Sequence, residues 1–284
     1  MSALSYRIFQ GFCFILLIFV VTAAAQKVAV LSPDGTEASR DFAERLEGSL
    51  APSFRITDNA MTEAAFASTK ADNKFNMTAD ESKTAGSAIG CDFFILVKTE
   101  TLRRSSSKRA QYYESHAAVY AVSSRTGRLV FWGLPRFEAA TQQEAQTLLN
   151  SATASLASEI ASKLKAAAKS ELAEPPLILM EEPSEPDSSM SKGLRTPVPY
   201  RRMKPEYTSD AFLYAIQATV DIIVDLDERG SIIRTEIVRW AGYGLDGSVE
   251  KAVRSMNWRP AERNGKSLPM RFLLRYNFKK TDKE

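Results

Sequence analysis

The sequence predicts an α+β protein with two folded domains, and three observations lead to this class. Residues 219–226 alternate between polar and apolar side chains, which is the period of a strand with one buried face. Residues 27–172 alternate between short apolar runs and helical patterns, as a mixed α/β sandwich-type domain does. Seven of the 12 prolines fall between Pro175 and Pro205, which predicts an extended linker. We therefore expect an amino-terminal segment at 1–26, an α/β domain at 27–172, a linker at 173–204 and a carboxy-terminal domain at 205–284.

The amino-terminal segment has two interpretations. Residues 8–25 are almost entirely apolar and follow a short start whose only charged side chain is Arg7. About 18 apolar residues are enough for a membrane anchor. The same run ends in three alanines before Gln26, which also fits a cleaved signal peptide. A predicted strand begins at Lys27 without a spacer, which favours cleavage, and in both cases the rest of the chain lies outside the cytoplasm.

Residues 27–172 predict a mixed sheet with crossover helices. Gly90 is expected to end one helix in the left-handed conformation, and residues 124–127 are expected to form a hairpin turn. Strands are predicted at 27–31, 54–57, 92–100, 111–123 and 128–137, and helices at 42–50, 62–69, 78–89 and 141–170.

Residues 205–284 predict the order helix, two-strand hairpin, helix, strand. Gly230 stands where the hairpin turn needs a positive φ. Asp246 or Ser248 is expected to cap the second helix, and Pro260 to stop it. The predicted elements are a short helix within 209–217, strands at 219–226 and 231–240, a helix at 245–256 and a final strand at 270–278.

The carboxy-terminal residues also carry motifs in a fixed order. They include Leu245-Asp246 before the helix, Pro260-Ala261 after it, and Asn264-Gly265-Lys266 before the last strand. With these motifs the stretch resembles the carboxy-terminal domain of TonB-family energy transducers. Ala218 and Thr208 depart from the family pattern, which has glycine and a second proline there. The motif positions that carry the resemblance are Pro205, Tyr207, Gly230, Leu245, Asp246, Trp258, Pro260 and Gly265.

A second resemblance concerns the amino-terminal domain. Three segments, 28–31, 54–58 and 89–93, follow one another at a characteristic spacing. In this they are similar to the amino-terminal domains of TolB and of curli-assembly lipoproteins, which are envelope proteins. The likeness is one of topology and includes no catalytic motif.

The sequence contains no enzyme motif. It lacks a Walker loop, a Gly-rich dinucleotide fingerprint and a His-based metal pair, and His116 is its only histidine. Asp221 and Asp225 share one strand face with Thr219, which fits a hydrated polar face better than a cation site. We therefore expect no enzyme activity, no cofactor and no metal, so that binding is the remaining function.

The last strand is the expected binding site. A strand at the edge of a sheet offers unpaired N–H and C=O groups to which a partner peptide adds as a further strand. The resemblance implies that an extended segment of an outer-membrane receptor pairs beside this strand. Alternation places Arg271, Leu273, Arg275 and Asn277 on the face opposite the aromatic side chains, where they would tune specificity. The expected partner-binding residues are Met270, Arg271, Leu273, Arg275 and Asn277.

Two functions stay open. The first is a TonB-family energy transducer of the Gram-negative envelope, anchored by 8–25, which contacts an inner-membrane motor and pulls on a TonB-dependent receptor to support transmembrane transport. The second is a non-energised periplasmic interaction module released by signal cleavage, which the lack of a histidine in the apolar segment favours. Other partners left open are a different envelope protein, peptidoglycan near Arg201-Arg202 and Lys204, and a second copy of the chain. The net charge of +3 gives no argument for nucleic acid.

Overall fold

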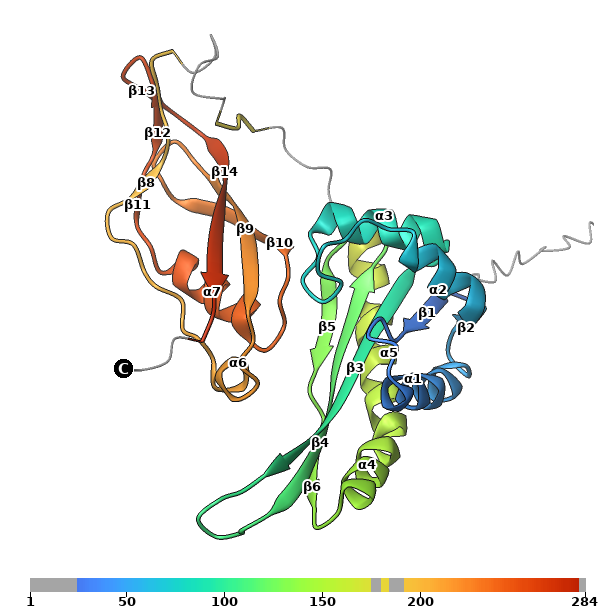
Figure 1. The fold of residues 1–284 in the computed structure, drawn as a ribbon. Helices are drawn as coiled ribbons and strands as arrows, with labels where there is room; N and C mark the ends of the chain where they lie inside the picture. Colours follow the sequence, from blue (N-terminus) through green and yellow to red (C-terminus); the bar gives the residue numbers. More distant parts are fainter. Residues whose placement is uncertain (1–24, 175–179, 184–191, 281–284) are drawn as a thin grey trace, which may run out of the picture.

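The computed structural model describes residues 25–174, 180–183 and 192–280, which form two lobes (Figure 1). The predicted signal peptide or membrane anchor lies, up to residue 24, outside the described residues. Among the residues described, no helix is both long enough and apolar enough to cross a membrane. Residues 25–174 make the amino-terminal lobe and residues 192–280 the carboxy-terminal lobe. The predicted mixed α+β class is confirmed.

The amino-terminal lobe is built on a sheet with the strand order β2-β1-β3-β4-β5, and β6 also pairs with β4. β1 is parallel to β2 and β3, whereas β4 is antiparallel to its neighbours. The strands are β1 Lys27–Leu31, β2 Arg55–Ile56, β3 Phe93–Arg104, β4 Tyr112–Ser123, β5 Leu129–Gly133 and β6 Arg136–Ala139.

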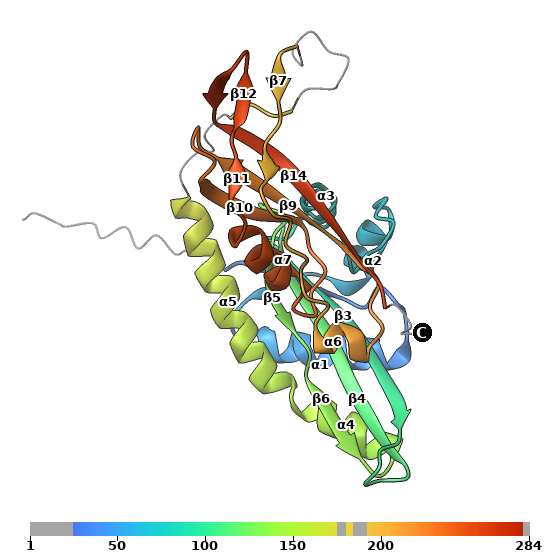
Figure 2. The same ribbon diagram turned by 90° about the vertical axis from the view of Figure 1, so that its left-hand side faces the viewer.

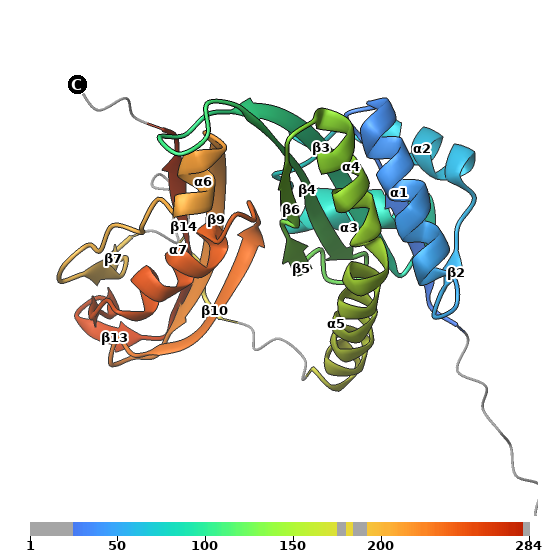
Figure 3. The ribbon, with the colours of Figure 1, turned by 90° about the horizontal axis from the view of Figure 1, so that it is seen from below.

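Three helices pack on one face of this sheet. α1 (Glu37–Leu50), α4 (Gln142–Ser151) and α5 (Thr153–Ala173) pack on that face (Figure 3). The opposite face carries α2 (Asn59–Ala67) and α3 (Ala79–Ile89). Alternate residues of the central strands therefore belong to two separate cores, because successive side chains of a strand point to opposite faces.

Two predicted elements of this lobe are divided in the structure. The strand predicted at 128–137 is split into β5 and β6, since Pro135 lies between them and has no N–H to give to a ladder. The helix predicted at 141–170 is split at Ala152, so that α4 and α5 are separate helices. Gly90 ends α3 in the left-handed conformation, as predicted.

The carboxy-terminal lobe is built on a three-stranded antiparallel sheet with the order β10-β9-β14. Its strands are β9 (Ala218–Leu226), β10 (Ile232–Arg239) and β14 (Met270–Phe278). α7 (Leu245–Arg254) packs against the inner face, and the predicted first helix is reduced to α6 (Ser209–Leu213). The predicted order of helix, hairpin, helix and strand is present.

Short strands extend this lobe into the region predicted as a linker. β7 (Leu194–Arg195) pairs with β12 (Ala261–Arg263), and β8 (Val198–Pro199) pairs with β11 (Trp258–Arg259). β13 (Lys266–Leu268) completes a hairpin with β12. Part of the region expected to be an extended coil is therefore paired with the carboxy-terminal lobe.

The two lobes share a hydrophobic core. The loop between β10 and α7 packs on the open face of the amino-terminal sheet, where Trp240 lies 5.4 Å from Tyr120 and Tyr243 lies 5.2 Å from Trp132, between ring centroids. Between them, Gly242 lies so close that a Cβ would be 2.5 Å from the Trp132 ring. The carboxy-terminal lobe thus covers apolar surface that the amino-terminal helices leave open.

Candidate functional site

The predicted binding strand, β14, lies at an edge of its sheet. It pairs with β9 from Met270↔Leu226 to Phe278↔Ala218 without a break in register. On its other side, the only backbone contact within the described parts of the chain is an isolated bridge between Glu181 and Met270. β14 lies on the side of the sheet away from the amino-terminal lobe (Figure 1), and it runs along most of the carboxy-terminal lobe (Figure 2).

The hydrogen bonds fix which backbone groups of β14 face the open side. The N–H of Arg271 donates to the carbonyl of Glu181, which is on that side, over 2.8 Å. Backbone groups alternate between the two sides of a strand, and the register with β9 is unbroken. The N–H groups of Leu273, Arg275 and Asn277 therefore also point to the open edge, whereas that of Leu274 points to β9.

The outer face of this sheet is formed by rows of arginine and aspartate. Arg275 donates two hydrogen bonds to Asp221, at 2.7 and 2.9 Å, and Arg239 donates another at 3.2 Å. Arg271 donates two to Asp225, at 2.7 and 2.8 Å. The two aspartates are only 2% and 4% exposed. The prediction of a hydrated face for them is wrong, because arginines on neighbouring strands cover both carboxylates.

The remaining predicted contact residues differ in how available they are. Leu273 lies between the two rows and is 51% exposed. Asn277 is exposed and its side-chain oxygen accepts a hydrogen bond from Thr219. Met270 is fully buried, so its side chain is not available at the surface. Leu273 is therefore the apolar side chain that a partner would meet beside the open backbone.

The start of the predicted domain is held by Pro205 and Tyr207. Pro205 is buried, and the hydroxyl of Tyr207 lies 3.0 Å from the carbonyl oxygen of Ala211 and 2.7 Å from that of Ile216. Tyr207 also stacks on Phe278 at the end of β14, with ring centroids 6.3 Å apart. These contacts fix the end of the candidate strand to the segment that precedes the sheet.

The other end of β14 is supported by Trp258 and Gly230. Trp258 is buried and packs edge-on against Phe272 at 5.0 Å. Gly230 has φ +82°, and a Cβ there would lie 2.2 Å from the carbonyl oxygen of Trp258. The prediction that Pro260 stops α7 is wrong, because the helix ends at Arg254 and Pro260 instead separates β11 from β12. Gly265 forms the turn of the next hairpin with φ +80°. These motif residues have structural roles near the strand.

The prediction that Asp246 or Ser248 caps α7 is wrong, because the N-cap is Gly244 and no side chain caps the helix. Asp246 has another role. Its carboxylate accepts the N–H groups of Ala241 and Gly242, each at 2.8 Å, and so holds the loop that packs on the amino-terminal lobe. Burial raises the pKa of Asp246 to about 6 in spite of these two bonds. Leu245 beside it is fully buried in the shared core.

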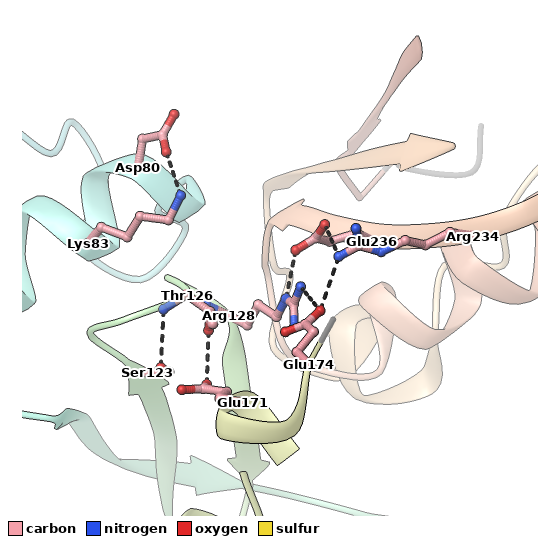
Figure 4. A network of polar contacts seen from close by, with 9 residues as sticks. All are labelled: Asp80, Lys83, Ser123, Thr126, Arg128, Glu171, Glu174, Arg234 and Glu236. Atoms are coloured by element: carbon pink, nitrogen blue, oxygen red, sulfur yellow. Dashed lines mark hydrogen bonds and ion pairs between the residues drawn. The ribbon is translucent and has the colours of Figure 1, made fainter. Parts of the chain in front are cut away.

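The opposite edge strand, β10, contacts the amino-terminal lobe. Arg128 donates to Glu236 on β10 at 2.6 Å and forms two further bonds with Glu174, at 2.8 and 2.9 Å (Figure 4). Arg234 pairs with both glutamates. The Arg128 guanidinium lowers the pKa of Glu174. Four charged groups from the two lobes thus bind one another along β10.

Backbone contacts cover the other end of β10. Thr78 forms a bridge with Arg239, and the N–H of Trp240 donates to the carbonyl of Met77 at 3.3 Å. Sequence reasoning missed these residues and the Arg128 network. The aromatic pair Trp240 and Tyr243 was the available signal, because two large apolar side chains in a short loop need a surface to cover them.

No cluster of three potential metal-ligating side chains exists among the residues that the structure describes. Arg201, Arg202 and Lys204, predicted as a basic cluster, are exposed. The geometry of this lobe therefore offers backbone pairing and charged surface.

Comparison with known proteins identifies the carboxy-terminal part of the chain. Residues 203–279 match the family model described as the Gram-negative bacterial TonB protein C-terminal. No curated protein matches the chain.

Several solved structures are similar to parts of the chain. The TonB carboxy-terminal domain of Pseudomonas aeruginosa is 18% identical, covers 37% of this chain and 98% of its own, and has a TM-score of 0.28. A hypothetical protein from Chlamydia trachomatis is 10% identical, with 50% and 99% covered and a TM-score of 0.35. A lipoprotein from Neisseria meningitidis is 16% identical, with 48% and 99% covered and a TM-score of 0.34.

Proposed function

We propose that this protein is a TonB-type envelope protein that binds an extended segment of an outer-membrane transporter by strand addition at β14, and so supports transport across that membrane. The observation that supports the proposal most is the asymmetry of the carboxy-terminal sheet. β10 contacts the amino-terminal lobe through Glu236 and Arg239, whereas β14 presents the outward N–H groups of Leu273, Arg275 and Asn277. A partner strand would satisfy those donors together.

Cross-linking in living cells tests this proposal. A photo-reactive amino acid at position 273 would lie beside a strand added to β14, and the captured protein is identified by mass spectrometry. Position 233 is the matched control, because Ile233 is also exposed, at 57%, but belongs to β10. We expect position 273, and not position 233, to capture an outer-membrane β-barrel transporter. Capture of the same proteins from both positions, or of no outer-membrane protein from position 273, would refute strand addition.

A second candidate function is a non-energised periplasmic interaction module. The shared core of the two lobes favours it, since a carboxy-terminal lobe packed on residues 25–174 is held close to them. In an energised transducer, residues 1–25 would remain as an inner-membrane anchor and receive force from a motor complex. The mass of the mature protein separates the two functions: a chain that begins at Gln26 has no anchor and would exclude the energised role.

A further inference from the structure

The first position of the open edge is already occupied by another segment of the same chain. Residues 180–183 lie beside the start of β14, where Glu181 forms a parallel bridge with Met270. The carbonyl of Glu181 accepts the N–H of Arg271 at 2.8 Å. This backbone bond is of the kind that an added partner strand would form at the same place. A partner that pairs along the whole edge must therefore displace Glu181.

Charge holds this segment at the edge. The carboxylate of Glu181 forms an ion pair with Arg263 on β12, and both side chains are partly buried. The pKa of Arg271 is raised, chiefly by Asp225, with a smaller contribution from Glu182. Glu181 thus pairs with Arg263 on β12, and the charge of Glu182 acts on Arg271 at the start of β14. Such pairs are individually weak at a surface.

Pro183 limits the contact to a single bridge. In a parallel ladder, the next bond would run from the N–H of residue 183 to the carbonyl of Arg271, and proline has no N–H. The following bond would join the N–H of Leu273 to the carbonyl of residue 183. The described structure contains neither bond. The segment therefore covers one outward donor and leaves those farther along β14 open, so that its contact is short enough to be displaced.

We propose that residues 180–183 act as an internal competitor that weakens binding of a partner strand to β14; this inference rests on the strand addition proposed above. Because the segment belongs to the same chain, its effective concentration at the edge is of the order of millimolar, as for short tethers. A partner must therefore compete with this segment for the backbone N–H of Arg271. Loss of the competitor then raises the affinity for the partner, and a longer competitor lowers it.

Two substitutions should act in opposite directions. Glu181→Lys removes the ion pair with Arg263 and brings a positive charge to Arg271, so it should release the segment. Pro183→Ala supplies the missing N–H, so it should extend the ladder to Leu273. Glu63→Lys is the charge-matched control, because Glu63 is exposed on α2 in the other lobe.

Amide hydrogen exchange of the full chain measures the competitor without any partner. In the wild type, we expect the amide of Arg271 to exchange about tenfold more slowly than that of Leu273, since only the former is bonded at the open edge. Glu181→Lys should abolish that difference, and Pro183→Ala should slow exchange at Leu273 about tenfold. If Arg271 exchanges as fast as Leu273 in the wild type, or if Glu181→Lys leaves its exchange unchanged, the proposal is overturned.

Binding of a synthetic peptide with the sequence of the transporter segment cross-linked at position 273 completes the test. We expect about tenfold tighter binding to Glu181→Lys, weaker binding to Pro183→Ala, and no change for Glu63→Lys, in line with removal or extension of a tethered competitor. Equal binding by all four proteins overturns the competitor while strand addition stands. Absence of binding by every variant overturns strand addition, and the competitor role with it.

Discussion

The side-chain amide of Asn76 pairs with the backbone of Thr219 in the way that one strand pairs with another. Its Oδ1 accepts the N–H of Thr219 at 2.9 Å, and its Nδ2 donates to the carbonyl of Thr219 at 2.8 Å. The same Nδ2 donates to the carbonyl of Trp240 at 2.6 Å. Asn76 belongs to the amino-terminal lobe and is 6% exposed. One buried side chain thus binds the first residues of β9 and the end of β10 to the other lobe.

Replacement of Asn76 should therefore loosen the contact between the lobes. Asn76→Ala leaves the N–H of Thr219 and two carbonyls without their partner, and an unsatisfied buried group costs about 1–3 kcal/mol. We expect a loss of that size in the free energy of unfolding, measured by urea titration. Asn257→Ala is the control, because Asn257 is exposed and its side chain has no hydrogen bond within the described structure. Equal effects of the two substitutions would mean that the amide does not hold the lobes together.

Proline substitution in β14 should separate binding from folding. Leu273→Pro removes an outward N–H from an exposed position, and an edge strand tolerates proline on that side. Leu274→Pro removes an N–H bonded to β9, and proline is not tolerated where its missing N–H belongs to a ladder within the sheet. We expect Leu273→Pro to keep the circular dichroism spectrum of the folded protein but not to bind the transporter segment. Leu274→Pro should lose both the folded spectrum and the binding. A folded Leu273→Pro variant with unchanged binding would show that the edge is not the binding site.

A methyl group at Gly242 should disturb the contact between the lobes more than one at Gly244. Both glycines have a positive φ, +71° and +74°, so an alanine at either costs about 1–2 kcal/mol in backbone strain. At 242 the Cβ would also lie 2.5 Å from the Trp132 ring, whereas at 244 its nearest neighbour is a Thr208 methyl at 3.3 Å. Overpacking adds about 1–3 kcal/mol. In thermal unfolding, we expect Gly242→Ala to be less stable than Gly244→Ala by about 1–3 kcal/mol, which is the overpacking contribution. Equal stabilities of the two variants would contradict the close approach of Gly242 to Trp132.

The raised pKa of Asp246 makes stability depend on pH. Because its pKa is about 6 in the folded chain and near 4 in an unfolded one, the folded state binds the proton more tightly. Its contribution to stability is therefore greatest below pH 4 and is lost as the pH rises through 6. Asp246→Asn, which cannot titrate, should flatten the stability profile between pH 4 and 7 in urea titrations at each pH. A profile with the wild-type slope would assign the pH dependence to other groups.

The sequence predicts the elements of the carboxy-terminal lobe well because its signals are local. The alternation of side chains along 270–278 predicted which face of β14 is buried, and in the structure Phe272 lies inside and Leu273 outside. The strands β7, β8 and β11 have two residues each, too few to show any period. The long helix is divided at Ala152, and no proline or glycine in the sequence marks this position.

The candidate edge could be expected from the sequence, but its surroundings could not. Which way the N–H of Arg275 points depends on the pairing partner of β14, and pairing is not a local property. The burial of Asp221 follows from Arg275 and Arg239 on neighbouring strands, which the alternation of a single strand does not reveal. The contact of Asn76 with Thr219 joins residues 143 positions apart, beyond the reach of any pattern in one segment.

The unbroken pairing of β14 with β9 has a mechanical consequence. Bonds of an antiparallel ladder lie perpendicular to the strands, so a pull along β14 strains all of them at the same time. A force that pulls one end of β14 away from β9 would instead break the hydrogen bonds one after another. The lobe therefore resists tension best along the axis of its open edge. Such a load would pass through β9 to β10 and, by way of Arg128 and Glu236, into the amino-terminal lobe.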